Sequence, residues 1–135
     1  QCIVLAIDAY KDQSNFKSGY NVSTHGGKKK TDIDALEWAI EGEKNGAGEI
    51  LLTSMNADGT KLGYDIELTR KISSEVRIPV IASGGAGKPI DMVNVLKKGN
   101  ASAVLAASIF HFGIYSIENV KKEMLKYNIP TRKTW

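Results

Sequence analysis

The chain has 135 residues, of which 42% are hydrophobic and 24% charged, a composition typical of a folded globular chain. Its net charge of +3 gives no indication of a nucleic-acid partner, and its longest apolar runs are far shorter than the ~20 residues of a membrane helix. One cysteine and two histidines exclude an internal disulfide and disfavour a metal cluster, so we expect a cytoplasmic protein without metal, cofactor, membrane or nucleic-acid contacts.

The first predicted unit starts with an apolar strand, Cys2–Ile7, and ends with a helix over Asp32–Asn45. The strand is nearly continuous in apolar residues, which is typical of a parallel strand covered on both faces. Between residues 9 and 31 the chain alternates weakly between apolar and polar residues around Ser18-Gly19. This alternation predicts a hairpin inserted after the first strand.

Three further units of strand and helix follow. Their predicted strands are Ile50–Thr53, Val80–Ala82 and Ala103–Ala107. Their predicted helices cover Asp65–Val76, the segment from Pro89 to Gly99, and a segment N-capped by Ser116. Alternating strands and helices predict right-handed βαβ connections and a parallel sheet. No linker-like segment divides the chain, so residues 1–135 are expected to form one folding unit.

Polar or small residues follow all four predicted strands, at Asp8, Thr53-Ser54, Ser83-Gly84-Gly85 and Ser108. In a (β/α)₈ TIM barrel this end carries the active site, and the loops after strands seven and eight often hold a phosphate. We therefore interpret the chain as a TIM-barrel half, with four βα units corresponding to strands 5–8. A small doubly wound fold is the alternative. A half barrel exposes two sheet edges, so it requires a missing amino-terminal half or a second copy of itself. The chain also starts without Met, which suggests a fragment.

The glycine-rich segment after the third predicted strand is the strongest candidate site. Gly84 and Gly85 lack a Cβ, so their backbone N–H groups can approach an anion, and the helix from Pro89 directs its positive end toward it. The alternative is a tight turn, although two adjacent glycines exceed what a turn requires. Ala107 and Ser108 would supply the other side of this phosphate site.

Two acidic residues at strand ends are candidates for chemistry. Asp8 ends the first strand, where a rigid and partly desolvated carboxylate suits a general acid or base; capping its own loop is the alternative. Asp58-Gly59 follows the second strand and is equally an ordinary turn signal. Thr53 is expected to bind a substrate hydroxyl or a neighbouring strand-end group.

Five segments of the chain resemble a known family: residues 6–9 (AIDA), 46–54 (GAGEILLTS), 58–65 (DGTKLGYD), 83–87 (SGGAG) and 107–112 (ASIFHF). They are similar to the carboxyl half of the cyclase subunit of imidazole glycerol phosphate synthase. The resemblance covers essentially the whole chain. The final segment separates this family from the sister isomerase of histidine biosynthesis, which shares the phosphate glycines but not the Phe-His-Phe ending.

The resemblance implies a (β/α)₈ barrel that receives ammonia from a glutaminase subunit in a heterodimer. The barrel condenses this ammonia with a phosphorylated small-molecule substrate, phosphoribulosyl formimino aminoimidazole carboxamide ribonucleotide. The products are imidazole glycerol phosphate and an aminoimidazole carboxamide ribonucleotide. Two aspartates on opposite barrel halves perform the acid–base chemistry. Asp8 matches the second, and the first belongs to the missing amino half, so the chain alone is expected to be inactive.

The resemblance also assigns binding residues. Those matching family residues at the substrate and at one phosphate site are Thr53, Asp58, Gly59, Ser83, Gly84, Gly85, Ala107 and Ser108. Glu49 matches a charged residue at the ammonia entrance, and Asn56 stands where the family usually carries an aspartate. Two alternatives remain open: a related cyclase for ammonia-dependent amidation of surface sugars, and a non-catalytic phosphate-binding half barrel.

Overall fold

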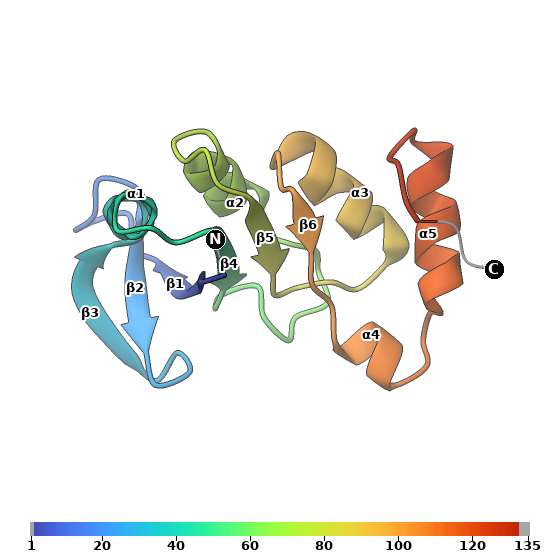
Figure 1. The fold of residues 1–135 in the computed structure, drawn as a ribbon. Coiled ribbons are helices and arrows are strands. Elements are labelled where there is room, and N and C mark those ends of the chain that lie inside the picture. Colours follow the sequence, from blue (N-terminus) through green and yellow to red (C-terminus); the bar gives the residue numbers. More distant parts are fainter. Residues whose placement is uncertain (1, 133–135) are drawn as a thin grey trace.

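The computed structural model describes residues 2–132, which form one six-stranded sheet with its helices (Figure 1). The strand order is β3-β2-β1-β4-β5-β6. Four strands are parallel: β1 (Val4–Lys11), β4 (Glu49–Ser54), β5 (Val80–Ser83) and β6 (Ala103–Val104). The antiparallel strands β2 (Tyr20–Thr24) and β3 (Lys29–Asp34) extend the sheet beside β1.

A helix follows each parallel strand, as the sequence predicts. These helices are α1 (Ala35–Lys44), α2 (Ile66–Ser73), α3 (Pro89–Lys98), the short α4 (Ser108–His111) and α5 (Ile117–Lys126). Pro89 occupies the first helical position of α3, where its missing N–H costs nothing. Ser116 begins α5 with a capping box, in which its Oγ accepts the Asn119 N–H at 3.1 Å.

The structure confirms a hairpin inserted after the first strand, and its tight turn lies beyond Ser18-Gly19. The turn between β2 and β3 lies at residues 25–28, where His25, Gly26 and Gly27 have φ angles of 56°, 63° and 82°. Two glycines suit this turn because positive φ costs them little. Ser18-Gly19 instead ends the connection from β1 to β2, and β1 itself continues past Asp8 to Lys11.

Other predicted boundaries also move, among them the start of the first helix and the end of the last strand. The first helix begins at Ala35 and not at Asp32, because residues 29–34 pair as β3 and the Asp34 side chain caps the helix. The last strand is only Ala103–Val104, because it is an edge strand and the chain then leads into α4.

The two faces of the parallel sheet differ in burial. Alternate strand residues pack beneath the helices and are at most 1% exposed: Ile7, Ala9, Ile50, Leu52, Val80 and Ala82. The intervening residues form the other face, here called the bare face: Val4, Ala6, Asp8, Glu49, Leu51, Thr53, Ile81, Ser83 and Ala103, with Leu105 directly after β6. On it, Val4 and Leu105 remain 48% and 43% exposed although they are apolar.

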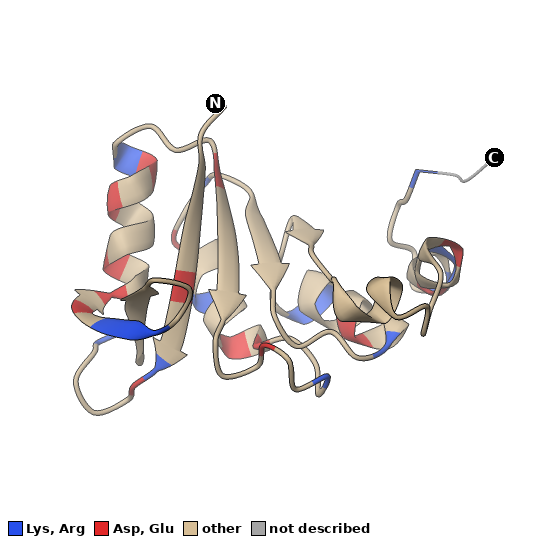
Figure 2. Cartoon of the chain, turned by 90° about the horizontal axis from the view of Figure 1, so that it is seen from below, with Lys and Arg blue, Asp and Glu red and all other residues tan. Residues whose placement is uncertain are grey.

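Helices α1, α2 and α3 all cover the same face of the sheet, since α1 packs on α2 and α2 on α3 (Figure 2). A doubly wound fold places helices on both faces, so that alternative is wrong. Parallel strands that neighbour one another in chain order, with helices on one side only, are the arrangement of a (β/α)₈ barrel wall. The four units confirm the predicted half barrel, and the bare face corresponds to the barrel interior.

Asp34 joins the hairpin to α1. Its carboxylate accepts the backbone N–H groups of Ser18 at 2.8 Å, Leu36 at 2.8 Å and Glu37 at 3.2 Å. Burial alone would raise the pKa of Asp34, but these hydrogen bonds favour the carboxylate and together hold its pKa below the usual 3.8.

We expect Asp34→Ala to lower the free energy of unfolding by about 1.5–3 kcal/mol, because a helix cap and hydrogen bonds to a charged group are lost together. Asp34→Asn should lose less, since its amide oxygen still accepts. Because the folded pKa is depressed, the contribution of Asp34 is present above about pH 3.8 and is lost as the pH falls through the lower folded value. Urea unfolding at pH 7 and at acid pH measures both effects. Equal stability of Asp34→Ala and the parent at pH 7 would contradict this role.

Candidate functional site

Polar side chains form a row across the carboxyl ends of three neighbouring strands. Asp8 of β1 pairs in register with Thr53 of β4, and Thr53 pairs in register with Ser83 of β5. All three belong to the bare face, and each is only half-buried. The sequence therefore predicted these neighbours correctly from strand ends alone.

A small cavity of about 140 Å³ lies beside this row, enclosed by the loops after β4, β5 and β6. It is lined by Asp58, Gly59, Lys61, Ser83, Gly84, Gly85, Ala86, Leu105, Ala106, Ala107 and Ser108. Pockets for whole small molecules usually measure ~300–1,000 Å³, so this one suits a single group at the end of a ligand. Seven residues that the sequence singled out for substrate or phosphate meet here; Asp8 and Thr53 lie outside the lining.

The cavity wall offers free hydrogen-bond donors. None of the backbone–backbone hydrogen bonds among residues 2–132 uses the N–H groups of Gly84, Gly85, Ala107 or Ser108 as donors. Ser108 begins α4, and the first N–H groups of a helix have no partner within it. Backbone donors that converge from two loops suit an anion with several acceptor oxygens.

The glycines after β5 also let two loops pack together. Gly84 and Gly85 have φ angles of 89° and 101°, and a Cβ on Gly85 would overlap the carbonyl of Gly63. The Gly63 N–H donates to the Gly85 carbonyl at 2.8 Å, and a Cβ on Gly87 would overlap the Lys61 carbonyl. Besides leaving room for an anion or a tight turn, these glycines allow the β4–α2 loop to pack against the β5–α3 loop. A contact between two loops that are distant in sequence cannot be predicted from the local sequence pattern.

Tyr64 joins two of the loops that surround the cavity. It is buried, and its hydroxyl donates to the Leu105 carbonyl at 2.9 Å. Burial raises the pKa of the Tyr64 phenol, with a smaller contribution from the Asp91 carboxylate, so the phenol stays a donor. The loops after β4 and β6 are thus joined by a hydrogen bond next to the candidate site.

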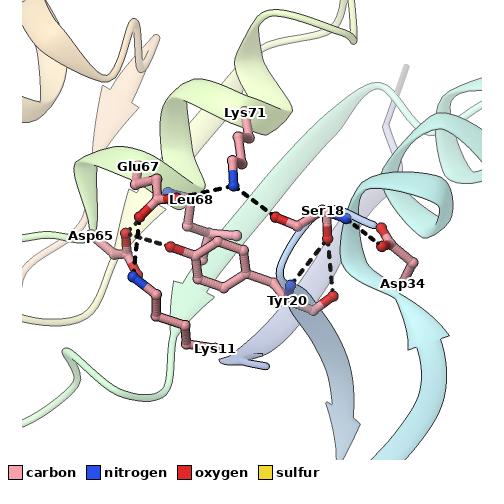
Figure 3. A network of polar contacts seen from close by, with 8 residues as sticks. All are labelled: Lys11, Ser18, Tyr20, Asp34, Asp65, Glu67, Leu68 and Lys71. Atoms are coloured by element: carbon pink, nitrogen blue, oxygen red, sulfur yellow. Dashed lines mark hydrogen bonds and ion pairs between the residues drawn. The ribbon is translucent and has the colours of Figure 1, made fainter. Parts of the chain in front are cut away.

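A polar network fixes the hairpin connection over α2 (Figure 3). Asp65 caps α2 and accepts the hydroxyls of Tyr20 at 3.2 Å and Ser54 at 3.1 Å. Glu67 pairs with Lys71 at 3.0 Å and with Lys11 at 3.1 Å, and these contacts hold the pKa of its carboxyl below the usual range. Because Ser54 directly follows Thr53, the network helps to fix the end of β4.

Asn56 belongs to this support and does not line the cavity. Its amide oxygen accepts the backbone N–H of Lys11 at 2.7 Å, which ties the loop after β4 to the end of β1. An amide oxygen accepts as a carboxylate does, so this contact survives the change from the aspartate that the resemblance leads one to expect.

Glu49 lies at the other end of the sheet. It begins β4 and pairs in register with Val4, two layers of bare-face residues away from Thr53. The structure therefore separates the predicted ammonia entrance from the row at the carboxyl ends, on the same face of the sheet.

Within residues 2–132 no group of three or more His, Cys, Asp or Glu side chains is placed to hold a metal ion. No helix in the described range is long and apolar enough to span a bilayer.

A one-sided parallel sheet, with a polar row and a small cavity at its carboxyl ends, defines half of a (β/α)₈ barrel. A sequence model of the histidine biosynthesis protein family matches residues 1–116, and the chain belongs to this family.

Three similar proteins carry the name imidazole glycerol phosphate synthase subunit HisF. The subunit of Dehalococcoides mccartyi is 58% identical over 132 residues, which are 98% of this chain and 51% of the relative. The subunit of Caulobacter vibrioides is 53% identical over 98% of this chain and 50% of its own length. The subunit of Syntrophobacter fumaroxidans is 51% identical over 100% of this chain and 53% of its own length. The chain thus spans about half the length of the curated relatives it matches.

Proposed function

We propose that the chain is the carboxyl-terminal half of a cyclase subunit of imidazole glycerol phosphate synthase, a cytoplasmic carbon–nitrogen lyase of histidine biosynthesis. The single observation that carries this is the row of Asp8, Thr53 and Ser83 beside an anion-type cavity on a bare sheet face. The shared name of relatives up to 58% identical supports the same reaction. In this reaction, ammonia and the ribulosyl substrate give imidazole glycerol phosphate and an aminoimidazole carboxamide ribonucleotide.

Each part of the site has a role in this proposal. The free N–H groups of Gly84, Gly85, Ala107 and Ser108 hold one phosphate of the substrate. With this end anchored, Thr53 and Asp58-Gly59 orient the substrate. Asp8 moves protons during addition of ammonia and ring closure. One carboxylate cannot serve both faces of the substrate, so a second acid–base group comes from the other barrel half.

Two macromolecular partners belong to the proposal. The other half of the barrel covers the bare face, where apolar Val4 and Leu105 are half exposed. A glutaminase subunit delivers ammonia at the amino ends of the strands, near Glu49. Ammonia then travels along the bare face toward Asp8, because Glu49 and Asp8 lie on that face at opposite ends of the sheet.

A graft tests the proposed reaction. This chain replaces the matching 132 residues of the Dehalococcoides mccartyi subunit, and product formation from the ribulosyl substrate is followed with ammonium salts as nitrogen source. We expect turnover within about tenfold of the unmodified subunit, because the proposal gives the residues at the carboxyl ends of the strands the same reaction in both proteins. A folded graft that binds phosphate esters without turnover would favour the non-catalytic half barrel. Amidation of a sugar substrate instead would favour the alternative cyclase.

The chain by itself is expected to associate. The Val4–Ile7 part of β1 and the whole of β6 leave sheet edges without a neighbouring strand on one side in the described structure, and such edges favour pairing with another chain. Two copies related by a two-fold axis would cover both bare faces. Light scattering at micromolar concentration should therefore report dimers or larger assemblies. A stable, folded monomer with cooperative unfolding would contradict this expectation.

A further inference from the structure

The backbone donors and hydroxyls of the cavity wall carry no net charge, so a cation there would add to their binding of a phosphate. Among the side chains that line it, Asp58 and Lys61 are the charged ones. Asp58 is an anion and repels a phosphate, while backbone donors and the Ser83 and Ser108 hydroxyls carry no net charge. A phosphate monoester carries −1.5 to −2 charges at neutral pH, so its binding is favoured by a cation at the cavity wall.

Lys61 is that cation, and its ammonium is available. Its Nζ lies 5.8 Å from the centroid of the Phe112 ring, and no ion pair among residues 2–132 includes it. Phe112 is 69% exposed and caps the far end of α4, whose first residue lines the cavity. A cation–π contact at an exposed site is weaker than a charge-assisted bond to phosphate, so the ammonium can leave the ring for a bound ligand.

The backbone of Lys61 lies at the cavity wall. Lys61 has φ +59°, which is uncommon for a residue with a Cβ, and glycine would adopt it at lower cost. Its carbonyl packs directly against Gly87, which has no side chain in the way. A lysine kept in this left-handed position is therefore held in place beside the donors of the β5–α3 loop.

From these observations we propose that Lys61 is a phosphate-binding residue: its ammonium moves from the Phe112 ring to pair with the phosphate that the backbone donors hold. This inference rests on the proposed phosphate site and extends it to a residue that the sequence analysis did not select. In this proposal the β4–α2 loop supplies the positive charge, and the loops after β5 and β6 supply the backbone donors that surround the phosphate.

Calorimetric titration of the grafted protein with glycerol 3-phosphate tests this role. Lys61→Gly keeps the left-handed backbone and removes the charge, and we expect about tenfold weaker binding. Lys61→Arg should stay within about threefold of the parent, because the positive charge is kept. Added salt should weaken binding by the parent more steeply than binding by Lys61→Gly, since an ionic contact is screened. A purely structural effect would not change this salt dependence.

Lys97→Met is the matched control. Lys97 lies 5.7 Å from the Tyr127 ring centroid, a contact like that of Lys61, but it is far along α3 and does not line the cavity. Its variant should bind as the parent does. Equal affinity of Lys61→Gly and the parent would overturn the role of Lys61 while leaving the phosphate site intact. Absence of binding by the parent would overturn the phosphate site and, with it, this inference.

Discussion

Asp8→Asn in the grafted protein should lower ammonia-dependent turnover by about 10²–10⁴-fold, the usual contribution of a general acid–base group. The asparagine keeps the size and polarity of the side chain but cannot take up or release a proton at neutral pH. In the described structure no hydrogen bond to another side chain or N–H group occupies the Asp8 carboxylate; the Ser23 hydroxyl donates at 3.0 Å to its backbone carbonyl instead. The carboxylate is thus free to act on a substrate over the bare face.

Binding separates catalysis from structure in this variant. Asp8 does not line the cavity, so Asp8→Asn should bind glycerol 3-phosphate as the parent does and unfold at a similar urea concentration. Asp32→Asn is the matched control, because Asp32 is an exposed carboxylate on β3 and belongs to the hairpin. It should retain full turnover. Near-normal turnover of Asp8→Asn would assign Asp8 to a structural role in its loop and end the proposed mechanism.

The order of strands and helices could be predicted because each depends on local signals. Apolar runs mark β1, β4 and β5, Pro89 marks the first turn of α3, and the N-cap Ser116 marks the start of α5. The boundaries that moved depend on pairing with distant residues. Residues 29–34 have no strong strand pattern, and they become β3 only because β2 offers them a partner. The edge position of β6 likewise shortens a run that looks like a full strand.

The row of site residues could be predicted for a related reason. Parallel strands in register bring their carboxyl ends together, so Asp8, Thr53 and Ser83 were expected to be neighbours. Lys61 was not, because its part in the cavity follows from a loop that crosses to the β5–α3 loop. The DGTK segment offered one signal, a lysine next to an expected turn. Nothing in its spacing indicates that this lysine lies at the cavity.

Gly85→Val should be the most damaging change in the cavity wall. Valine at φ +101° is strained, at a cost of about 1–2 kcal/mol for a left-handed residue. Its Cβ would also overlap the Gly63 carbonyl, which is backbone and cannot rotate away. Moving that loop breaks the 2.8 Å hydrogen bond from the Gly63 N–H to the Gly85 carbonyl. Such crowding typically lowers the free energy of unfolding by about a further 1–3 kcal/mol.

Gly46→Val isolates the part due to crowding. Gly46 has nearly the same φ, +98°, but a Cβ there meets nothing within 4 Å. In urea unfolding of the grafted protein, both variants should show the backbone strain, and Gly85→Val should be less stable by about a further 1–3 kcal/mol. Only Gly85→Val should lose affinity for glycerol 3-phosphate, by at least about tenfold, because its loops can no longer present their N–H groups together. If the two variants were equally stable and bound phosphate equally, the glycine loop would be an ordinary turn, and the phosphate would have to bind elsewhere on the barrel.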